Sequence, residues 1–149
     1  MSEPSAVLVV AHHTAATAPL LEAVAERAAR APARFHLVVP QQARGLHRLL
    51  DPEDSGRDEA ERVLAQALPL LTRAAGAEVT GSIGVPEPLM AIEDAVNRDD
   101  YDEIIISTLP LGVSRWLRLD LISKTRALGV PVTHVQAGER VDAAAAAAV

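Results

Sequence analysis

The chain has 149 residues, of which 49% are hydrophobic and 2% aromatic, and its 14 basic and 20 acidic residues give a net charge of −6. The absence of cysteine excludes disulfides, thiolate catalysis and cysteine-ligated metal sites. The acidic balance and the few aromatic rings argue against nucleic-acid binding, and no apolar run reaches the ~18 residues of a membrane-spanning helix. We therefore expect a cytoplasmic protein that binds neither nucleic acid nor membrane.

Five short apolar runs predict β-strands. The runs at 6–11 (AVLVVA) and 104–106 (III) are continuous in Val and Ile, which is typical of central strands that are covered on both faces. Weaker runs lie at 34–39, 77–83 and 130–135, and we expect them nearer the edges of the sheet.

Helical periodicity fills the intervals between these runs. Apolar residues recur on one face over 19–30, 57–75 and 87–97, and a final helix is predicted to end at Leu128, with Gly129 as the residue after its C-cap. Strands that alternate with helices run parallel through right-handed crossovers. The sequence therefore predicts a three-layer α/β/α sandwich with a five-stranded parallel sheet.

The predicted domain covers residues 1–136. Residues 137–149 include six successive alanines and little patterning, and we expect a frayed or disordered tail.

A ligand crevice is expected beyond the carboxyl ends of the strands, where the strand order of a parallel sheet reverses. If the first and fourth strands are neighbours, the residues that follow them line this crevice. The candidate lining residues are Ala11, His12, Thr14, Val39, Pro40, Ser107, Thr108, Pro110, Ser114, Arg115, Asp120 and Leu121. No catalytic residue is assigned, because the sequence contains no recognisable nucleophile, base and orienting acid and none of the usual phosphate-binding glycine loops.

Two histidines and two hydroxyl residues in this set have alternative interpretations. Because adjacent residues at a strand end point to opposite faces, we expect the imidazoles of His12 and His13 not to reach one metal ion, and no metal site is assigned. The hydroxyls of Ser107 and Thr108 either contact a ligand or satisfy loose amides at the strand end.

The charge is unevenly distributed along the chain. Residues 112–126 contain Arg115, Arg118, Lys124 and Arg126 against Asp120, which favours either an anionic ligand or an ordinary solvated helix. Residues 51–62 carry six acidic and two basic side chains, and we expect a solvated loop and first helical turn there.

Two motifs carry a family resemblance. In residues 84–108, GVPEPLMAIEDAVNRDDYDEIIIST, a Gly-x-Pro enters a helix and an Asp precedes a strand, and residues 129–132, GVPV, begin the last strand. With the order of elements, these motifs resemble the universal stress protein (UspA-like) family over 6–135. The resemblance implies the strand order 3-2-1-4-5 and a homodimer formed through the last strand, here Val130 to Val135.

The resemblance also implies an ATP site from which this chain departs. Many members use an aspartate after the first strand and a motif G-x-x-G, nine residues, G-[ST] after the fourth. Ala11–His12 stands at the aspartate, and the four motif positions hold Ser107, Pro110, Asp120 and Leu121. Proline removes a backbone donor, and an aspartate at a helix N-terminus would cap the amides that a phosphate needs.

We therefore expect a non-enzymatic, dimeric stress-related protein that takes no cofactor and does not hold ATP in the usual way. It is expected to act through a protein partner or through a small ligand other than ATP, for which a small anion is the candidate. The alternative is a nucleotide-binding protein in which Arg115 and Arg118 replace the glycine amides, because arginine grips phosphate bidentately. An enzyme on a similar fold is a third class, which rests on fold analogy alone.

Overall fold

The structure is a computed structural model that describes residues 3–41, 55–108 and 115–136. Its elements are β1 (Ser5–Val10), α1 (Ala18–Arg30), β2 (Ala33–Pro40), α3 (Ser55–Ala75), β3 (Thr80–Gly84), α4 (Pro88–Arg98), β4 (Glu103–Thr108), α5 (Arg115–Arg126) and β5 (Val132–Gln136). Each predicted strand and helix is present, with boundaries shifted by a few residues. The predicted tail at 137–149 lies outside the described residues. No helix in the described ranges is both long and apolar enough to cross a membrane.

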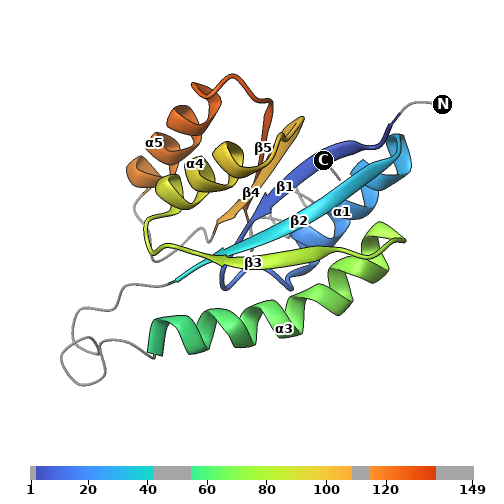
Figure 1. The fold of residues 1–149 in the computed structure, drawn as a ribbon, viewed down its shortest axis with the longest axis horizontal. Coiled ribbons are helices and arrows are strands. Elements are labelled where there is room, and N and C mark those ends of the chain that lie inside the picture. Colours follow the sequence, from blue (N-terminus) through green and yellow to red (C-terminus); the bar gives the residue numbers. More distant parts are fainter. Residues whose placement is uncertain (1–2, 42–54, 109–114, 137–149) are drawn as a thin grey trace, which may run out of the picture.

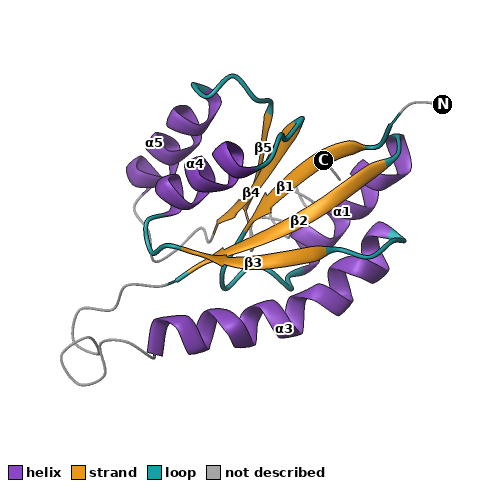
Figure 2. Ribbon diagram, in the orientation of Figure 1, coloured by secondary structure: helices purple, strands orange, loops and turns teal. Residues whose placement is uncertain are grey.

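The five strands form one parallel sheet in the order β3-β2-β1-β4-β5, as the resemblance implied (Figures 1 and 2). β1 lies in the middle, where Val9 pairs with Leu37 of β2 and Ile105 of β4. The chain runs from β1 outwards through β2 and β3 and then crosses over to β4. The strand order therefore reverses between β1 and β4, and their carboxyl ends are adjacent.

Helices cover both faces of the sheet, which confirms the predicted three layers (Figure 1). Val7 and Val9 of β1 belong to the core on the side of α1 and α3, whereas Leu8 and Val10 belong to the core on the side of α4 and α5. These alternating side chains are all nearly inaccessible to solvent. The continuous apolar run of β1 thus follows from its position between two cores.

The end of α5 differs slightly from the prediction. The helix ends at Arg126 rather than at Leu128. Gly129 has the expected positive φ, 88°, and its N–H donates to the carbonyl of Arg126 at 3.0 Å. A residue without Cβ adopts this conformation without strain, so Gly129 directs the chain from α5 into β5.

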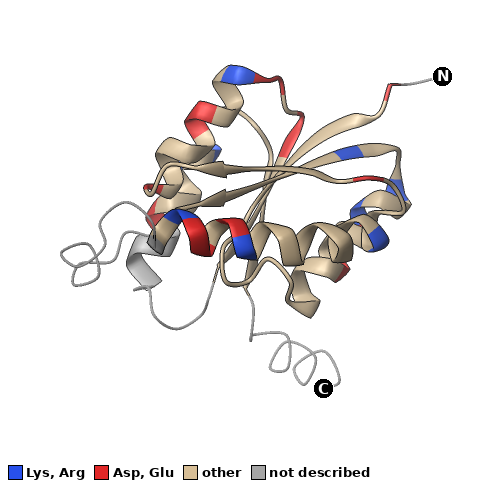
Figure 3. Cartoon of the chain, turned by 60° about the horizontal axis from the view of Figure 1, so that its bottom comes forward, with Lys and Arg blue, Asp and Glu red and all other residues tan. Residues whose placement is uncertain are grey.

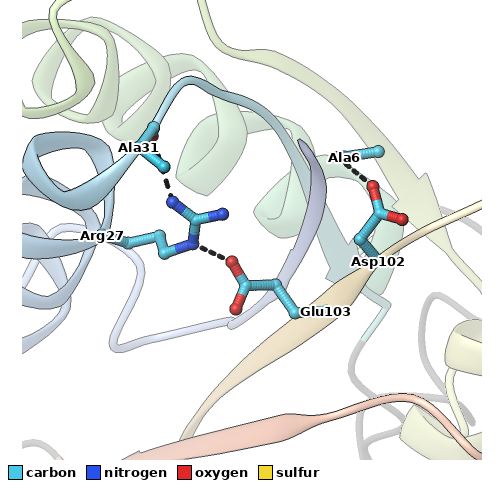
Figure 4. A network of polar contacts seen from close by, with 5 residues as sticks. All are labelled: Ala6, Arg27, Ala31, Asp102 and Glu103. Atoms are coloured by element: carbon cyan, nitrogen blue, oxygen red, sulfur yellow. Dashed lines mark hydrogen bonds and ion pairs between the residues drawn. The ribbon is translucent and has the colours of Figure 1, made fainter. Parts of the chain in front are cut away.

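A polar network closes the amino-terminal edge of the sheet (Figure 4). The guanidinium of Arg27, in α1, pairs with Glu103 at the start of β4 and donates to the Ala31 carbonyl at 3.1 Å. Nearby, the Asp102 carboxylate accepts a hydrogen bond from the backbone N–H of Ala6 at 2.8 Å. The network therefore joins α1, β1 and β4 at one edge.

The side chain of His36 connects β2 with the edge strand β3. Its Nδ1 lies 2.7 Å from Thr80 Oγ1 and its Nε2 lies 2.9 Å from Ser82 Oγ, so β2 and β3 share side-chain as well as backbone hydrogen bonds. Burial lowers the pKa of His36 below its ordinary value of 6.5; the Asp99 carboxylate opposes this shift and Arg98 reinforces it. The structure thus favours the neutral imidazole.

This shift predicts a specific loss of stability in acid. At a pH between the lowered pKa of His36 in the folded chain and its pKa in the unfolded chain, the unfolded chain binds more protons. The contribution of neutral His36 to the free energy of unfolding is therefore complete above the unfolded-state pKa, and it is lost as the pH falls through the folded-state pKa. In urea titrations at about pH 7.5 and about pH 5.5, the wild type should lose more free energy of unfolding than His36→Gln. Equal losses in the two proteins would contradict this assignment.

Candidate functional site

The candidate site lies at the carboxyl edge of the sheet, where the chain leaves β1 and β4. Because the strands are parallel and each helix returns over the sheet, the first turns of α1 and α3 also begin at this edge (Figure 1). The residues that reach it therefore come from the segment after β1, the end of β4 and the start of α3.

The segment after β1 is a series of tight turns. The backbone N–H of Ala11 donates to the Val38 carbonyl at 3.3 Å, and Ala11 is buried in the core rather than lining a crevice. Beyond it, the N–H of Ala15 donates to the His12 carbonyl at 3.0 Å, and both the N–H and the hydroxyl of Thr17 donate to the Thr14 carbonyl, at 3.1 and 2.7 Å. The alternation of a strand therefore stops at Ala11.

The turn brings the two histidines together. The ring centroids of His12 and His13 lie 4.3 Å apart with the rings tilted by 54°. Our expectation that they point to opposite faces was wrong, because it assumed a strand where the chain already turns. His13 Nε2 also lies 3.8 Å from Oε1 of Glu59, in the early part of α3.

Glu59 was not among the predicted site residues. It belongs to the acidic segment that we expected to be a solvated loop and helical turn, and Figure 3 shows acidic and basic residues side by side at the start of α3. One of these pairs, Arg57 Nε and Glu61 Oε1 at 3.3 Å, is indeed an exposed ion pair within the helix. The sequence signal for Glu59 was its place near the start of a helix that begins at the carboxyl edge.

Two hydroxyls at this edge are buried without a hydrogen bond. The residues Thr14 and Ser107 are 2% and 7% exposed, and neither Thr14 Oγ1 nor Ser107 Oγ has a partner among the described residues. A buried hydroxyl without a partner destabilises a protein by about 1–3 kcal/mol. Such groups in a site at the switch point are typical of positions that a ligand satisfies.

Thr108 differs from its neighbour Ser107. Its Oγ1 lies 2.8 Å from Nε2 of His134, across the β4–β5 pairing. The Thr108 hydroxyl thus has a side-chain partner at the strand end, whereas the Ser107 hydroxyl has none among the described residues.

Four other candidates have contacts of their own in the structure. Val39 is fully buried in the core beside α1 and α3, and Pro40 is buried and pairs with Gly84 at the end of β3. Leu121 packs against the core on the α4 and α5 side. Asp120 forms an ion pair with Lys124, with 3.1 Å between Oδ2 and Nζ.

The expected capping role of Asp120 is wrong, because α5 begins at Arg115 and Asp120 lies in its second turn. The ion pair with Lys124 also compensates one of the four positive charges of 112–126. Pro110 and Ser114 lie outside the described residues, and for Arg115 and Arg118 only the helical backbone is described.

No protein-family model matches the sequence, and no curated protein is significantly similar to it. Solved structures nevertheless share its fold. A universal stress protein from Archaeoglobus fulgidus covers 88% of this chain and 93% of its own at 22% identity, with a TM-score of 0.63.

Two further neighbours were solved with nucleotides. The universal stress protein from Archaeoglobus fulgidus in complex with dAMP covers 91% of this chain and 99% of its own at 21% identity, with a TM-score of 0.60. A universal stress protein family protein from Arabidopsis thaliana with AMP bound covers 91% and 93% at 16% identity, with a TM-score of 0.58. This chain has the universal stress protein fold. At these identities the similarity shows the fold alone.

The unpartnered hydroxyls predict an unusual response to substitution. Thr14→Val removes a hydroxyl that makes no hydrogen bond and keeps the shape of the side chain, so the free energy of unfolding should stay equal or rise. Thr125→Val is the matched control, because Thr125 is also fully buried but its hydroxyl donates to the Leu121 carbonyl at 2.8 Å. The control should lose about 1 kcal/mol in urea unfolding.

A loss in Thr14→Val as large as that in Thr125→Val would show that the Thr14 hydroxyl already has a partner in the folded chain.

Proposed function

We propose that this protein is a cytoplasmic, UspA-like stress-related protein that acts by binding a small ligand and not by catalysis. The observation that carries the proposal is a pair of buried hydroxyls without a partner among the described residues. Thr14 Oγ1 lies in the turn after β1 and Ser107 Oγ lies near the end of β4, and the sheet order reverses between these two strands. The fold shared with universal stress proteins supports the stress-related assignment. Because hydroxyls donate to anionic oxygens, a small anion is the ligand class that suits them.

The crevice is not built to hold ATP in the usual way. In the ATP motif that the resemblance implies, an aspartate follows the first strand and a glycine occupies the position of Ser107. Here Ala11–His12 occupies the place of the aspartate, and the buried side chain of Ser107 occupies space that a glycine would leave open to a phosphate. The chain therefore lacks the first glycine of the motif, where the backbone amides would approach a phosphate.

Nucleotide binding by another route is the second candidate. Neighbours of the same fold were solved with dAMP and AMP, which are smaller than ATP and carry one phosphate. Arg115 and Arg118 lie in the first turn of α5, a few residues after β4 in the sequence. A guanidinium can donate two parallel N–H hydrogen bonds to one phosphate.

Calorimetric titration of the full chain with ATP, AMP and inorganic phosphate tests the proposal. We expect no ATP binding at about micromolar concentrations, and binding of a small anion that weakens at least about tenfold in Ser107→Ala and is unchanged in Thr125→Val. Micromolar ATP binding would contradict the proposal. AMP binding that Ser107→Ala leaves intact and Arg115→Ala with Arg118→Ala abolishes would establish the second candidate instead.

We further propose a homodimer through the last strand, Val130 to Val135. β5 pairs only with β4 among the described strands, so its second edge carries backbone groups that another strand could use. On the α1 side, a groove of about 560 Å³ runs beside it and is lined in part by Ile105 and Thr133. Among the described residues, no other strand pairs with the outer edge of β5, and a groove borders part of one of its faces.

Light scattering at micromolar concentration should give the mass of a dimer. Thr133→Lys places a charge on the exposed part of β5 and should shift the mass towards the monomer. Glu78→Lys, exposed just before the opposite edge strand β3, is the control and should stay dimeric. A monomeric wild type would refute the dimer.

A further inference from the structure

One cluster at the carboxyl edge is not used by the proposed function. His12, His13 and Glu59 each offer a ligand atom, and these three atoms lie within 4.8 Å of one another. We propose that the three side chains bind a divalent transition-metal ion, with Zn²⁺ as the best fit. The proposal does not depend on the proposed function, since a metal could bind here whether or not a small anion binds at Thr14 and Ser107.

The donor set determines the class of metal. Two imidazole nitrogens and one carboxylate oxygen suit Zn²⁺, Ni²⁺ or Cu²⁺, whereas Mg²⁺ and Ca²⁺ prefer oxygen donors throughout. Two histidines with one glutamate form a known type of three-residue zinc site that keeps a fourth position open to water or a ligand.

The distances are close to those that such a site needs. Donor bonds of about 2.0–2.2 Å place two ligand atoms of a tetrahedral ion about 3.3 Å apart. His13 Nε2 and Glu59 Oε1 are already 3.8 Å apart, and the His12 and His13 rings are in contact at 4.3 Å between centroids. Binding of an ion would therefore require the three donor atoms, now within 4.8 Å of one another, to approach by about 1 Å.

Two separate backbone segments, the turn after β1 and the early part of α3, carry the three metal-ligand side chains. His12 and His13 lie in the tight turn after β1, where the His12 carbonyl accepts a hydrogen bond from the N–H of buried Ala15. Glu59 is followed in α3 by Ala60, which is fully buried in the core and anchors this part of the helix. Core packing therefore fixes the turn and α3 at a short separation before any ion binds.

The site is also open to solvent. The side chains of His13 and Glu59 are 40% and 19% exposed, so an ion can enter without unfolding of the core. A partly exposed contact between a histidine and a glutamate contributes little to stability without a metal. If the cluster were only that contact, removing Glu59 would change the stability slightly and leave zinc binding unaffected.

Calorimetric titration of the chelator-treated full chain with Zn²⁺ tests the proposal. We expect one equivalent to bind with about micromolar affinity or tighter, and the midpoint of thermal unfolding to rise with the zinc concentration. Glu59→Gln and His13→Gln should each weaken binding at least about tenfold. Glu61→Gln, the same change one residue beyond Ala60, is the matched control, because Glu61 pairs with Arg57, and it should bind zinc like the wild type.

Histidine NMR signals separate this site from adventitious binding at other histidines. Zinc should shift the imidazole signals of His12 and His13 and leave those of His36 and His134 unchanged. No zinc binding, equal binding in Glu59→Gln and Glu61→Gln, or shifts confined to other histidines would each overturn the proposal. Because His13 and Glu59 are partly exposed, their glutamine variants should keep the fold, which the thermal unfolding curves check.

Discussion

The parallel pairing of β1 with β4 is the constraint on which the rest of the structure depends. β1 already pairs with β2, and the second pairing makes it the central strand, buried on both faces between two apolar cores. Because the chain leaves β1 for β2 and returns to β4 on its other side, α1 and α3 cover one face while α4 and α5 cover the other. The carboxyl ends of β1 and β4 therefore meet where no crossover helix runs between them, and ligand-binding groups can gather there.

The two edges of the sheet use their polar groups differently. At the amino edge, Arg27 pairs with Glu103 and the Asp102 carboxylate accepts the Ala6 N–H (Figure 4). The buried guanidinium of Arg27 and the buried N–H of Ala6 therefore have partners within the chain. At the carboxyl edge, the hydroxyls of Thr14 and Ser107 are buried without a partner among the described residues. Since unpaired buried hydroxyls destabilise a fold, their concentration at one edge is evidence for a site and not for a stabilising network.

The sheet and its strand order follow from the sequence because they depend on hydrophobic runs and on a motif resemblance, which are local signals. Continuous Val and Ile identified β1 and β4 as interior strands, and Gly129 marked the turn into β5. The weaker run at 34–39, expected nearer an edge, forms β2, which is as interior as β4. The site was harder to predict because its contacts join distant segments. The proximity of His12 to His13 depends on where β1 ends, and that of His13 to Glu59 depends on how α3 packs.

The proposed metal cluster and the proposed anion site share one short segment. His12 and Thr14 lie in the same series of turns, in which the carbonyls of both residues accept backbone hydrogen bonds from residues nearer α1. An ion that fixes the His12 side chain also restricts this turn, and so does a ligand that engages the Thr14 hydroxyl. Two ligands that order the same segment influence each other's affinity, and the influence is reciprocal. If both proposals hold, occupancy of the metal site would adjust ligand binding without moving the sheet.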